Sequence, residues 1–481
     1  MKKNPNILFL MCDQLQASVL KNDSQCKTSN FDYLMSVGTR FDRAYTPNAV
    51  CSPARASLMT GLLPHNHGVL WVTHTVDDDQ GRLREDNMHW AQLLENEGYH
   101  TGYFGKWHIE KSCEVERYGW QVNGCRCEVI SELYKKTEEE VWGGQKPELN
   151  YSPVKYYDSP QGYQKSVFYG VTDIVPEKRP LGLITKMALD YLENFSGNDD
   201  PWCCFVSIPE PHDPYICGRK AFDMYEVDSI TLPPNVFDEM ENRPNIYKKA
   251  GRVWENVTER EHKEAMACYY GSITEIDEQF GLLIKKVKEM GQLDNTMIIL
   301  TTDHGEMLGA HGLYCKNISA SEEVYNIPLV MSGPGICEGI VSGARVGLHD
   351  LCQTILELSG LDVFNVPDSR SFAEIFQNPQ MEAEYKKGYA EYFGSRIMLT
   401  QRIVWDGSWK FVFNGFDYDE LYDLDDDPYE MNNLIDDPEY ENVVKRLCKQ
   451  MWDSIRKTND YSLYRSNYPI LRVAPFGPLI D

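Results

Sequence analysis

Residues 51–61, Cys-Ser-Pro-Ala-Arg-Ala-Ser-Leu-Met-Thr-Gly, place a sulfur nucleophile at the start of a predicted helix. Ser52 belongs to the residue types that cap helices, so we expect it to be the N-cap. Arg55 then lies one turn after Cys51 on the same face, and Gly61 ends the helix. Because a helix N-terminus with a guanidinium beside it attracts anions, the stretch combines an anion site with a nucleophile. Taken alone, it is equally compatible with a buried cysteine ahead of an ordinary helix.

The continuous apolar run of residues 6–12 predicts a parallel strand that is covered on both faces. Residues 296–302, with the apolar stretch 297–300 at their centre, predict a further core strand. Open α/β sheets bind ligands at the carboxyl ends of such strands, and polar residues follow both runs there. Aspartate and neutral histidine are good ligands for a divalent cation, and an amide oxygen can also coordinate one. We interpret these residues as metal ligands, although an aspartate after a strand can also be a turn residue or helix cap. They are Asp13, Gln14, Asp303 and His304.

Basic residues follow two further predicted strands. Residues 99–104 lead to Lys106 and His108, and residues 202–208 lead to a proline-rich loop that holds His212. Lysine and histidine in such positions can bind an anion and exchange protons with it. The alternatives are a solvated lysine, a hydrogen-bonded histidine and a purely structural loop.

The motif Cys-x-Pro-x-Arg-x-x-x-x-Thr-Gly, which begins at Cys51, resembles the signature of the type I sulfatases. Gly-Lys-Trp-His at residues 105–108 also resembles an element of that family, and the order of the segments is similar over essentially the whole chain. The resemblance implies that Cys51 is oxidised to formylglycine. In that family the hydrated aldehyde is the nucleophile, and residue 51 is also a ligand of the metal.

The resemblance also implies roles for the basic residues. Arg55, Lys106 and Lys316 would neutralise charge on the sulfate group during transfer. His108 would deprotonate the nucleophile, and His212 would protonate the leaving alcohol. Without the preceding motif, Lys316 would be interpreted as an ordinary surface lysine.

Two residues depart from the usual sulfatase pattern. Gln14 stands where the family has a second aspartate, and His304 stands where many members have asparagine. Both changes resemble the phosphonate monoester hydrolases, so a phosphonate monoester hydrolase or phosphodiesterase with the same site is the alternative. We expect one divalent cation, Ca²⁺ first, with Mn²⁺ or Mg²⁺ as alternatives because imidazole suits transition metals. A rival of another class is a non-enzymatic anion-binding protein in which Cys51 is never oxidised.

Composition narrows the classes of partner. The 481 residues are 42% hydrophobic, and 73 acidic against 47 basic residues give a formal charge of −26. Because no basic stripe interrupts this charge, we expect no nucleic-acid partner. The expected substrate is a small-molecule or saccharide sulfate ester rather than a large polyanion, which the net charge would repel. The expected protein partner is the enzyme that generates formylglycine, and a homo-oligomer is left open.

The sequence also predicts the cellular compartment of the protein. It has no run of eighteen apolar residues and no signal peptide before residues 6–12, so we expect a cytoplasmic protein without a membrane span. Its fourteen cysteines would then stay reduced, most of them in the core.

Alternation of apolar runs with amphipathic stretches predicts an α/β fold. Its large mixed, mostly parallel sheet would be sandwiched by helices, an arrangement that the resemblance implies to be alkaline phosphatase-like. We expect a catalytic domain at residues 1–385 and a smaller C-terminal α+β subdomain, with an antiparallel sheet and an extended tail, at 386–481. An acidic turn at 421–434, which sulfatases share, would be an exposed loop. The expected helices are at residues 28–37, 88–97, 185–195, 259–290, 348–358 and 439–457.

Residues 110–180 have weak periodicity and many aromatic side chains. Long irregular insertions are more often functional than not, so we expect this segment to wall the substrate pocket, with an oligomer contact as the alternative. The aromatic content would suit a sugar or an aryl ring equally, and the alcohol half of the substrate therefore stays open.

Overall fold

Strand β1 (Asn6–Asp13) lies inside the main sheet, and all of its residues are buried. It pairs in parallel with β7 (Trp202–Pro211) on one side and with β9 (Thr296–Thr302) on the other. The computed structural model describes residues 4–77, 80–84, 86–316, 318–364, 366–463 and 474–480. An unbroken apolar sequence is typical of a strand covered on both faces, and the prediction for β1 is confirmed.

The described residues form a nine-stranded sheet in the order β10-β2-β11-β9-β1-β7-β3-β4, with β12 paired to β2. Strands β10 and β11 run antiparallel to their neighbours, and the other pairs are parallel. The sheet is therefore mixed and mostly parallel, as predicted. Its other strands are β2 (Gly38–Tyr45), β3 (His100–Gly105), β4 (Val122–Cys125), β10 (Asn326–Ile327), β11 (Leu329–Ser332) and β12 (Ile340–Gly347).

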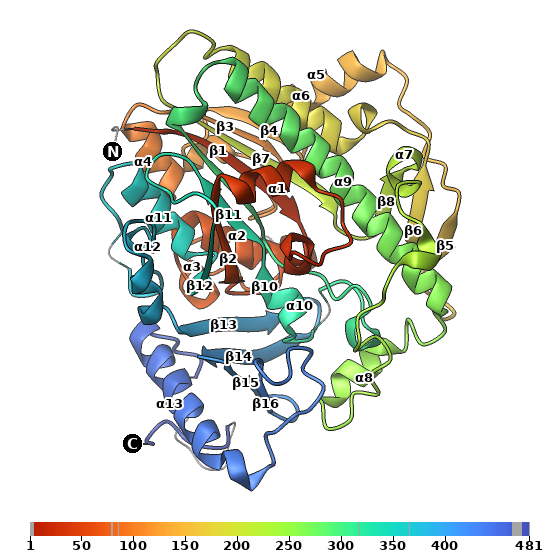
Figure 1. Cartoon of the computed structure of the whole chain (residues 1–481), viewed down its shortest axis with the longest axis vertical. Helices are drawn as coiled ribbons and strands as arrows, with labels where there is room; N and C mark the ends of the chain where they lie inside the picture. The colour runs from red at the N-terminus through yellow and green to blue at the C-terminus, as the bar shows by residue number, and fades with distance from the viewer. Residues whose placement is uncertain are drawn as a thin grey trace.

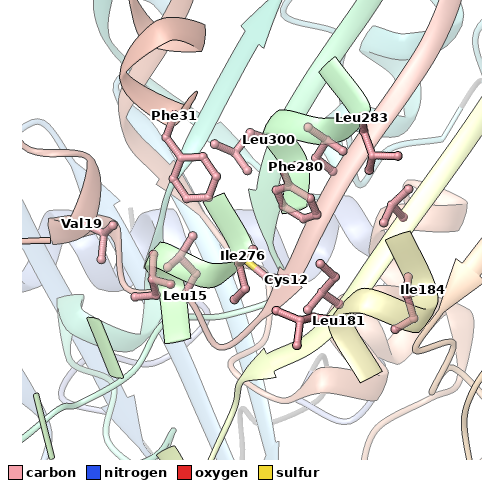
Figure 2. Close-up of a cluster of buried hydrophobic side chains, with 14 of the residues drawn as sticks. Cys12, Leu15, Val19, Phe31, Leu181, Ile184, Ile276, Phe280, Leu283 and Leu300 are labelled. Atoms are coloured by element: carbon pink, nitrogen blue, oxygen red, sulfur yellow. The ribbon is translucent and has the colours of Figure 1, made fainter. Parts of the chain in front are cut away.

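Helices cover both faces of this sheet. Alternate side chains of β1 accordingly lie in two different cores. Leu8, Leu10 and Cys12 pack with α1 (Ser29–Ser36), α6 (Pro180–Glu193) and α9 (Glu259–Glu289). Figure 2 shows Cys12 of β1 close to side chains of α6 and α9. Ile7, Phe9 and Met11 pack with α2 (Cys51–Thr60), α4 (Trp90–Asn96) and α11 (Asp350–Leu358).

The long helix α9 shows how local sequence fixes an element. Thr258 is its N-cap, and the Thr258 side chain accepts a hydrogen bond from the backbone of Glu261 while the Glu261 side chain bonds back to Thr258. This capping box satisfies backbone donors that a helix start leaves unpaired. Apolar residues at helical spacing, among them Ile276, Phe280 and Leu283, then face the sheet.

A second unit occupies one end of the molecule, drawn in blue in Figure 1. Its antiparallel sheet has the order β13-β14-β15-β16, and α13 (Glu441–Thr458) packs on β14 and β15. The predicted α/β fold with a C-terminal α+β portion is confirmed, although β16 was not predicted because it lies in the acidic segment. The strands are β13 (Lys387–Gly394), β14 (Met398–Asp406), β15 (Trp409–Asn414) and β16 (Glu420–Asp423).

The remaining elements lie mostly in the segments between the main strands. A small sheet in the order β5-β6-β8 contains β5 (Val154–Tyr156), β6 (Val167–Thr172) and β8 (Tyr215–Gly218). A helical turn, α10, comes directly before β10. The other helices are α3 (Pro64–His67), α5 (Glu132–Trp142), α7 (Arg219–Phe222), α8 (Asn245–Gly251), α10 (Glu322–Tyr325) and α12 (Glu374–Gln377).

The cysteines differ in one respect from the prediction. Cys113 and Cys127 form a disulfide, so the prediction of reduced thiols is wrong for this pair. The chain turns back between them, and both sulfur atoms lie near the carbonyl oxygen of Val129. Among the other cysteines, all except Cys315 and Cys337 are buried, as core residues should be. In the part of the chain that the structure describes, no helix has both the length and the apolar character to cross a bilayer.

Candidate active site

Four neighbouring strands of the main sheet end at one place. They are β9, β1, β7 and β3, in that spatial order. Asp303 and His304 follow β9, Asp13 ends β1, His212 follows β7, and Lys106 follows β3. Since all four strands are parallel to one another, their carboxyl ends share an edge, and residues from distant parts of the sequence meet there.

Helix α2 delivers the residue at the centre of this group. Cys51 is its first residue, and Val50 is the N-cap. The prediction that Ser52 caps the helix is wrong, because the Ser52 hydroxyl accepts a hydrogen bond from the Thr73 backbone instead. Gly61 ends the helix in the left-handed conformation, φ 71°, as predicted.

Arg55 is 1% exposed and ties the strand ends together. Its Nε donates to Asp303 Oδ2 at 2.7 Å, and its terminal nitrogens donate to Asp13 Oδ2 at 3.2 Å and to Ser207 Oγ at 2.8 Å. It also donates to the Lys106 carbonyl oxygen at 2.9 Å. The guanidinium thus fixes the two carboxylates relative to each other and offsets the cost of burying them.

Two lysines surround the sulfur of Cys51 with positive charge. Lys106 Nζ is 3.9 Å from Sγ and forms a short ion pair with Asp13. Burial raises the pKa of the Cys51 thiol, but the charges of Lys106, Lys316 and His304 outweigh burial and hold that pKa well below its usual range. The position therefore stabilises a negative charge on the side chain of residue 51.

Two histidines lie on the open side of Cys51. Burial and the charge of Lys106 lower the pKa of His108 to about 4, so its imidazole is neutral near pH 7. His212 Nδ1 lies 2.8 Å from the Asp213 carbonyl oxygen, and its Nε2 lies 2.8 Å from Lys316 Nζ. Burial and Lys316 lower the pKa of His212, but Asp213 and Asp13 raise it above its ordinary value. One histidine is thus suited to accept a proton and the other to hold one.

Gln14 is held by acidic neighbours. Its side-chain nitrogen donates to Glu306 and, at 3.1 Å, to Asp213 Oδ1. Its side-chain oxygen accepts from Lys316 Nζ at 3.2 Å. A carboxylate at position 14 would face those two carboxylates without a proton to share, which gives a physical reason for an amide here.

The side chains of Asp13, Cys51, Asp303 and His304 are buried, and their potential ligand atoms lie within 4.8 Å of one another. His304 donates from Nδ1 to the Gly305 carbonyl oxygen at 2.9 Å, which leaves Nε2 directed at the cluster, 3.2 Å from Cys51 Sγ. Burial lowers the pKa of His304, but Asp303 and Cys51 raise it to about 9, and a metal ion bound to Nε2 would displace that proton. Two carboxylates and an imidazole with its tautomer fixed are a donor set that fits a divalent cation.

A cavity of about 450 Å³ opens beside these residues. Residues 126–128 of the 110–180 segment line it, which confirms the prediction that this segment walls the pocket, although the lining contains no phenylalanine, tyrosine or tryptophan among the described residues. Large aromatic side chains of that segment, such as Trp120 and Tyr134, are buried in the two main cores instead. The lining residues are His74, Lys106, His108, Arg126, Cys127, Glu128, Pro209, Glu210, His212 and Asp213.

Sequence reasoning missed several residues that support the group. Ser207 binds Arg55, and His74 Nδ1 lies 3.2 Å from His108 Nε2 with the two rings stacked. Asp213 and Glu306 orient Gln14. Asp213 stands beside His212 in the proline-rich loop and could have been found there, whereas no motif marks His74.

Comparisons with known proteins agree with this arrangement. A family model described as Sulfatase matches residues 5–361, and one described as N-sulphoglucosamine sulphohydrolase, C-terminal, matches residues 309–457. The ulvan-active sulfatase of Formosa agariphila is 26% identical over 490 residues, which cover 98% of this chain and 86% of that protein.

Solved structures share the fold. The phosphonate monoester hydrolase of Silicibacter pomeroyi has a TM-score of 0.78 at 22% identity, with 95% of this chain and 96% of that chain covered. A protein solved in complex with its substrate D-glucosamine-2-N,6-O-disulfate has a TM-score of 0.73 at 22% identity, with 95% and 99% covered. This chain thus shares the fold of these solved proteins. With a family model that spans most of its length, the chain belongs to the sulfatase family of sulfuric ester hydrolases.

Proposed function

We propose that this enzyme hydrolyses the sulfate ester of a saccharide, using a nucleophile derived from Cys51 and one divalent cation. The proposal rests on the side chains and the helix end that surround Cys51. Its sulfur lies at a helix N-terminus, next to Lys106 and His304, where a negative charge is stabilised. A hydroxyl that replaces the sulfur at this position would attack as its anion, and the same surroundings would stabilise that anion.

We propose that a maturation enzyme oxidises Cys51 to formylglycine. In that form the side chain would supply a hydroxyl for attack on sulfur and a second hydroxyl whose deprotonation expels sulfate. Lys106 and Lys316 are positioned to bind the sulfate oxygens, since each lies near residue 51 or its immediate contacts. Fixed cations in a partly buried site lower the energy of the charge that develops during transfer.

The roles of the histidines follow from their protonation. His108, neutral near pH 7, would take the proton from the second hydroxyl. His212, with its raised pKa, would give a proton to the oxygen of the leaving alcohol. Arg55 has all its described contacts with Asp13, Asp303, Ser207 and the Lys106 carbonyl, so we assign it to positioning the carboxylates.

Asp13, Asp303, His304 and residue 51 would hold the divalent cation, with the Gln14 oxygen as a fifth candidate. Bound there, the cation would polarise a substrate oxygen and lower the pKa of the nucleophile. Asp13 Oδ1 lies 3.7 Å from His304 Nε2 and 3.8 Å from Cys51 Sγ. Carboxylate oxygens are the ligands that Ca²⁺ prefers, and two carboxylates stand here, so we propose Ca²⁺ first.

A saccharide is the alcohol that the pocket supports best. The cavity is lined by charged and imidazole side chains, and an aryl or quaternary ammonium group would find no described aromatic wall. Hydroxyl groups, in contrast, match such a lining. The names of two similar proteins, an ulvan-active sulfatase and one solved with a disulfated glucosamine, point the same way.

A phosphonate monoester hydrolase is the second candidate function, favoured by Gln14 and His304 and by the likeness in fold. Both functions are tested by comparing kcat/KM for an aryl sulfate and an aryl phosphonate monoester on protein shown to carry the aldehyde. We expect the sulfate to be preferred, because Lys106 and Lys316 are both present. A strong phosphonate preference would overturn the proposal in favour of the second candidate.

A further inference from the structure

The cavity beside Cys51 contains a cation that the catalytic scheme does not use. Arg126 follows β4 and lines the cavity together with Lys106 and His108. Its backbone N–H donates to the Gly105 carbonyl oxygen at 2.7 Å, so its main chain is fixed directly beside Lys106. The position of Arg126 relative to the sulfate-binding lysine is therefore set by the sheet and not by a free loop.

The guanidinium of Arg126 has no ion pair within the described parts of the chain. Its described side-chain contact is with the ring of Tyr134, 6.0 Å away. Burial raises the pKa of Glu210, and the charges of Arg179 and Arg126 act against burial, so Arg126 interacts with Glu210 at longer range. No carboxylate of the described residues forms an ion pair with Arg126, and its half-buried guanidinium is available to an anion in the cavity.

A buried acceptor lies in the same lining. Glu210 Oε2 is shielded from solvent and has no hydrogen-bond partner among the described residues. Leaving a buried carboxylate oxygen unpaired is unfavourable, so a donor from a ligand would satisfy it. Hydroxyl groups of a sugar are such donors.

Resting on the proposed function, we propose that the enzyme selects sulfated saccharides that carry a second anionic group, a sulfate or a carboxylate, and that Arg126 binds that group. Glu210 accepts a hydrogen bond from a hydroxyl of the same sugar. The long-range repulsion by the acidic protein is overcome locally, because Arg126 and Lys106 both line the cavity. A guanidinium matches planar or tetrahedral oxyanions through paired N–H donors, which makes the contact specific as well as attractive.

The test uses the matured enzyme and pairs of sulfated monosaccharides that differ only in one added sulfate or carboxylate. D-glucosamine 6-sulfate and D-glucosamine-2-N,6-O-disulfate form one such pair. In the pair that wild type cleaves best, we expect kcat/KM to be about 10- to 100-fold higher for the sugar with the second anionic group than for the sugar without it. This factor corresponds to the free energy of about one hydrogen bond to a charged group. In Arg126→Gln the ratio should fall to near one, mainly through KM, and Arg126→Lys should restore part of it.

Arg117→Gln is the matched control, because Arg117 is exposed, pairs with Glu114 at 3.4 Å and does not line the cavity. It should leave the ratio unchanged. Equal kcat/KM for both members of every pair in wild type, or an unchanged ratio in Arg126→Gln, would overturn the inference. If an aryl sulfate is cleaved but no saccharide sulfate is, the inference also fails while sulfate ester hydrolysis stands. Failure to cleave any sulfate ester would instead refute the proposed function.

Discussion

Lys410 of β15 is fully buried and joins the C-terminal sheet to the catalytic loops. Its Nζ donates to the Ala320 carbonyl oxygen at 2.6 Å and to Glu430 Oε1 at 2.7 Å, and lies 3.0 Å from Glu322 Oε1. Ala320 and Glu322 follow Lys316, whereas Glu430 belongs to the acidic turn. Burial raises the pKa of Glu322, but Lys410 outweighs burial and holds that pKa below its ordinary value.

The substitution Lys410→Met should therefore destabilise the fold strongly. Removing one partner of a buried ion pair lowers the free energy of unfolding by about 3–5 kcal/mol, because the remaining carboxylates are left without compensation. Those carboxylates would take up a proton in the folded variant, so that their folded pKa exceeds the unfolded value of about 4.3. When the pKa of a carboxyl group is higher in the folded than in the unfolded state, the free energy of unfolding falls as pH rises, by about 1.4 kcal/mol per pH unit for one proton. The loss in free energy of unfolding of Lys410→Met relative to wild type, called the deficit below, should therefore be larger at pH 7 than at pH 5 by up to about 3 kcal/mol.

Urea unfolding of variant and wild type at pH 5 and pH 7, followed by tryptophan fluorescence, measures this difference. Lys449→Met is the matched control, since Lys449 is 45% exposed and lies 3.7 Å from Asp453 on the surface of α13. It should change stability by less than about 1 kcal/mol. A deficit for Lys410→Met below about 1 kcal/mol at pH 7, or one of equal size at both pH values, would refute the reasoning.

Three further predictions concern the nucleophile, the cation and one buried histidine. Cys51→Ala should abolish sulfate release because no nucleophile remains, and Cys51→Ser should allow at most one slow transfer, seen as a burst without turnover; full turnover by either variant contradicts the mechanism. Removal of divalent cations with a chelator should abolish activity, and added Ca²⁺ should restore it; unchanged activity in chelator would exclude the cation role. Burial lowers the pKa of His65, but Glu391, 2.6 Å away, raises it to about 9. The stabilising contribution of that pair should be complete below about pH 6.5 and lost as pH rises through 9. The difference in unfolding free energy between wild type and His65→Gln should therefore shrink from pH 6 to pH 10, and a constant difference would contradict the assignment.

The strands that carry the site could be predicted because they are unbroken apolar runs. β1 and β9 need no tertiary information to be recognised, and Asp13 and Asp303 follow them directly. The convergence of the strand ends then follows from the rules of parallel sheets. The position of Cys51 at a helix start could also be predicted, although the cap residue was wrong by two positions.

Features that depend on packing between distant segments could not be predicted. Glu430 lies in a turn that composition describes as an exposed acidic loop, yet it is 1% exposed because Lys410 reaches it from β15. The aromatic residues of 110–180 carry no sequence signal for the side of the sheet on which they lie, and Trp120 and Tyr134 are in different cores. The contact between Arg126 and Gly105 joins β3 to the segment after β4, and only the folded chain shows that Arg126 enters the cavity.

The most direct test of the central claim is mass analysis of the peptide that contains residue 51, made on the same preparations whose sulfate release is measured. Preparations with different degrees of maturation should be compared. The account predicts that the rate of sulfate release per mole of protein rises in proportion to the fraction of residue 51 present as the aldehyde, and is negligible when all of it is cysteine. Sulfate release at full rate by protein that carries only unmodified Cys51 would contradict it.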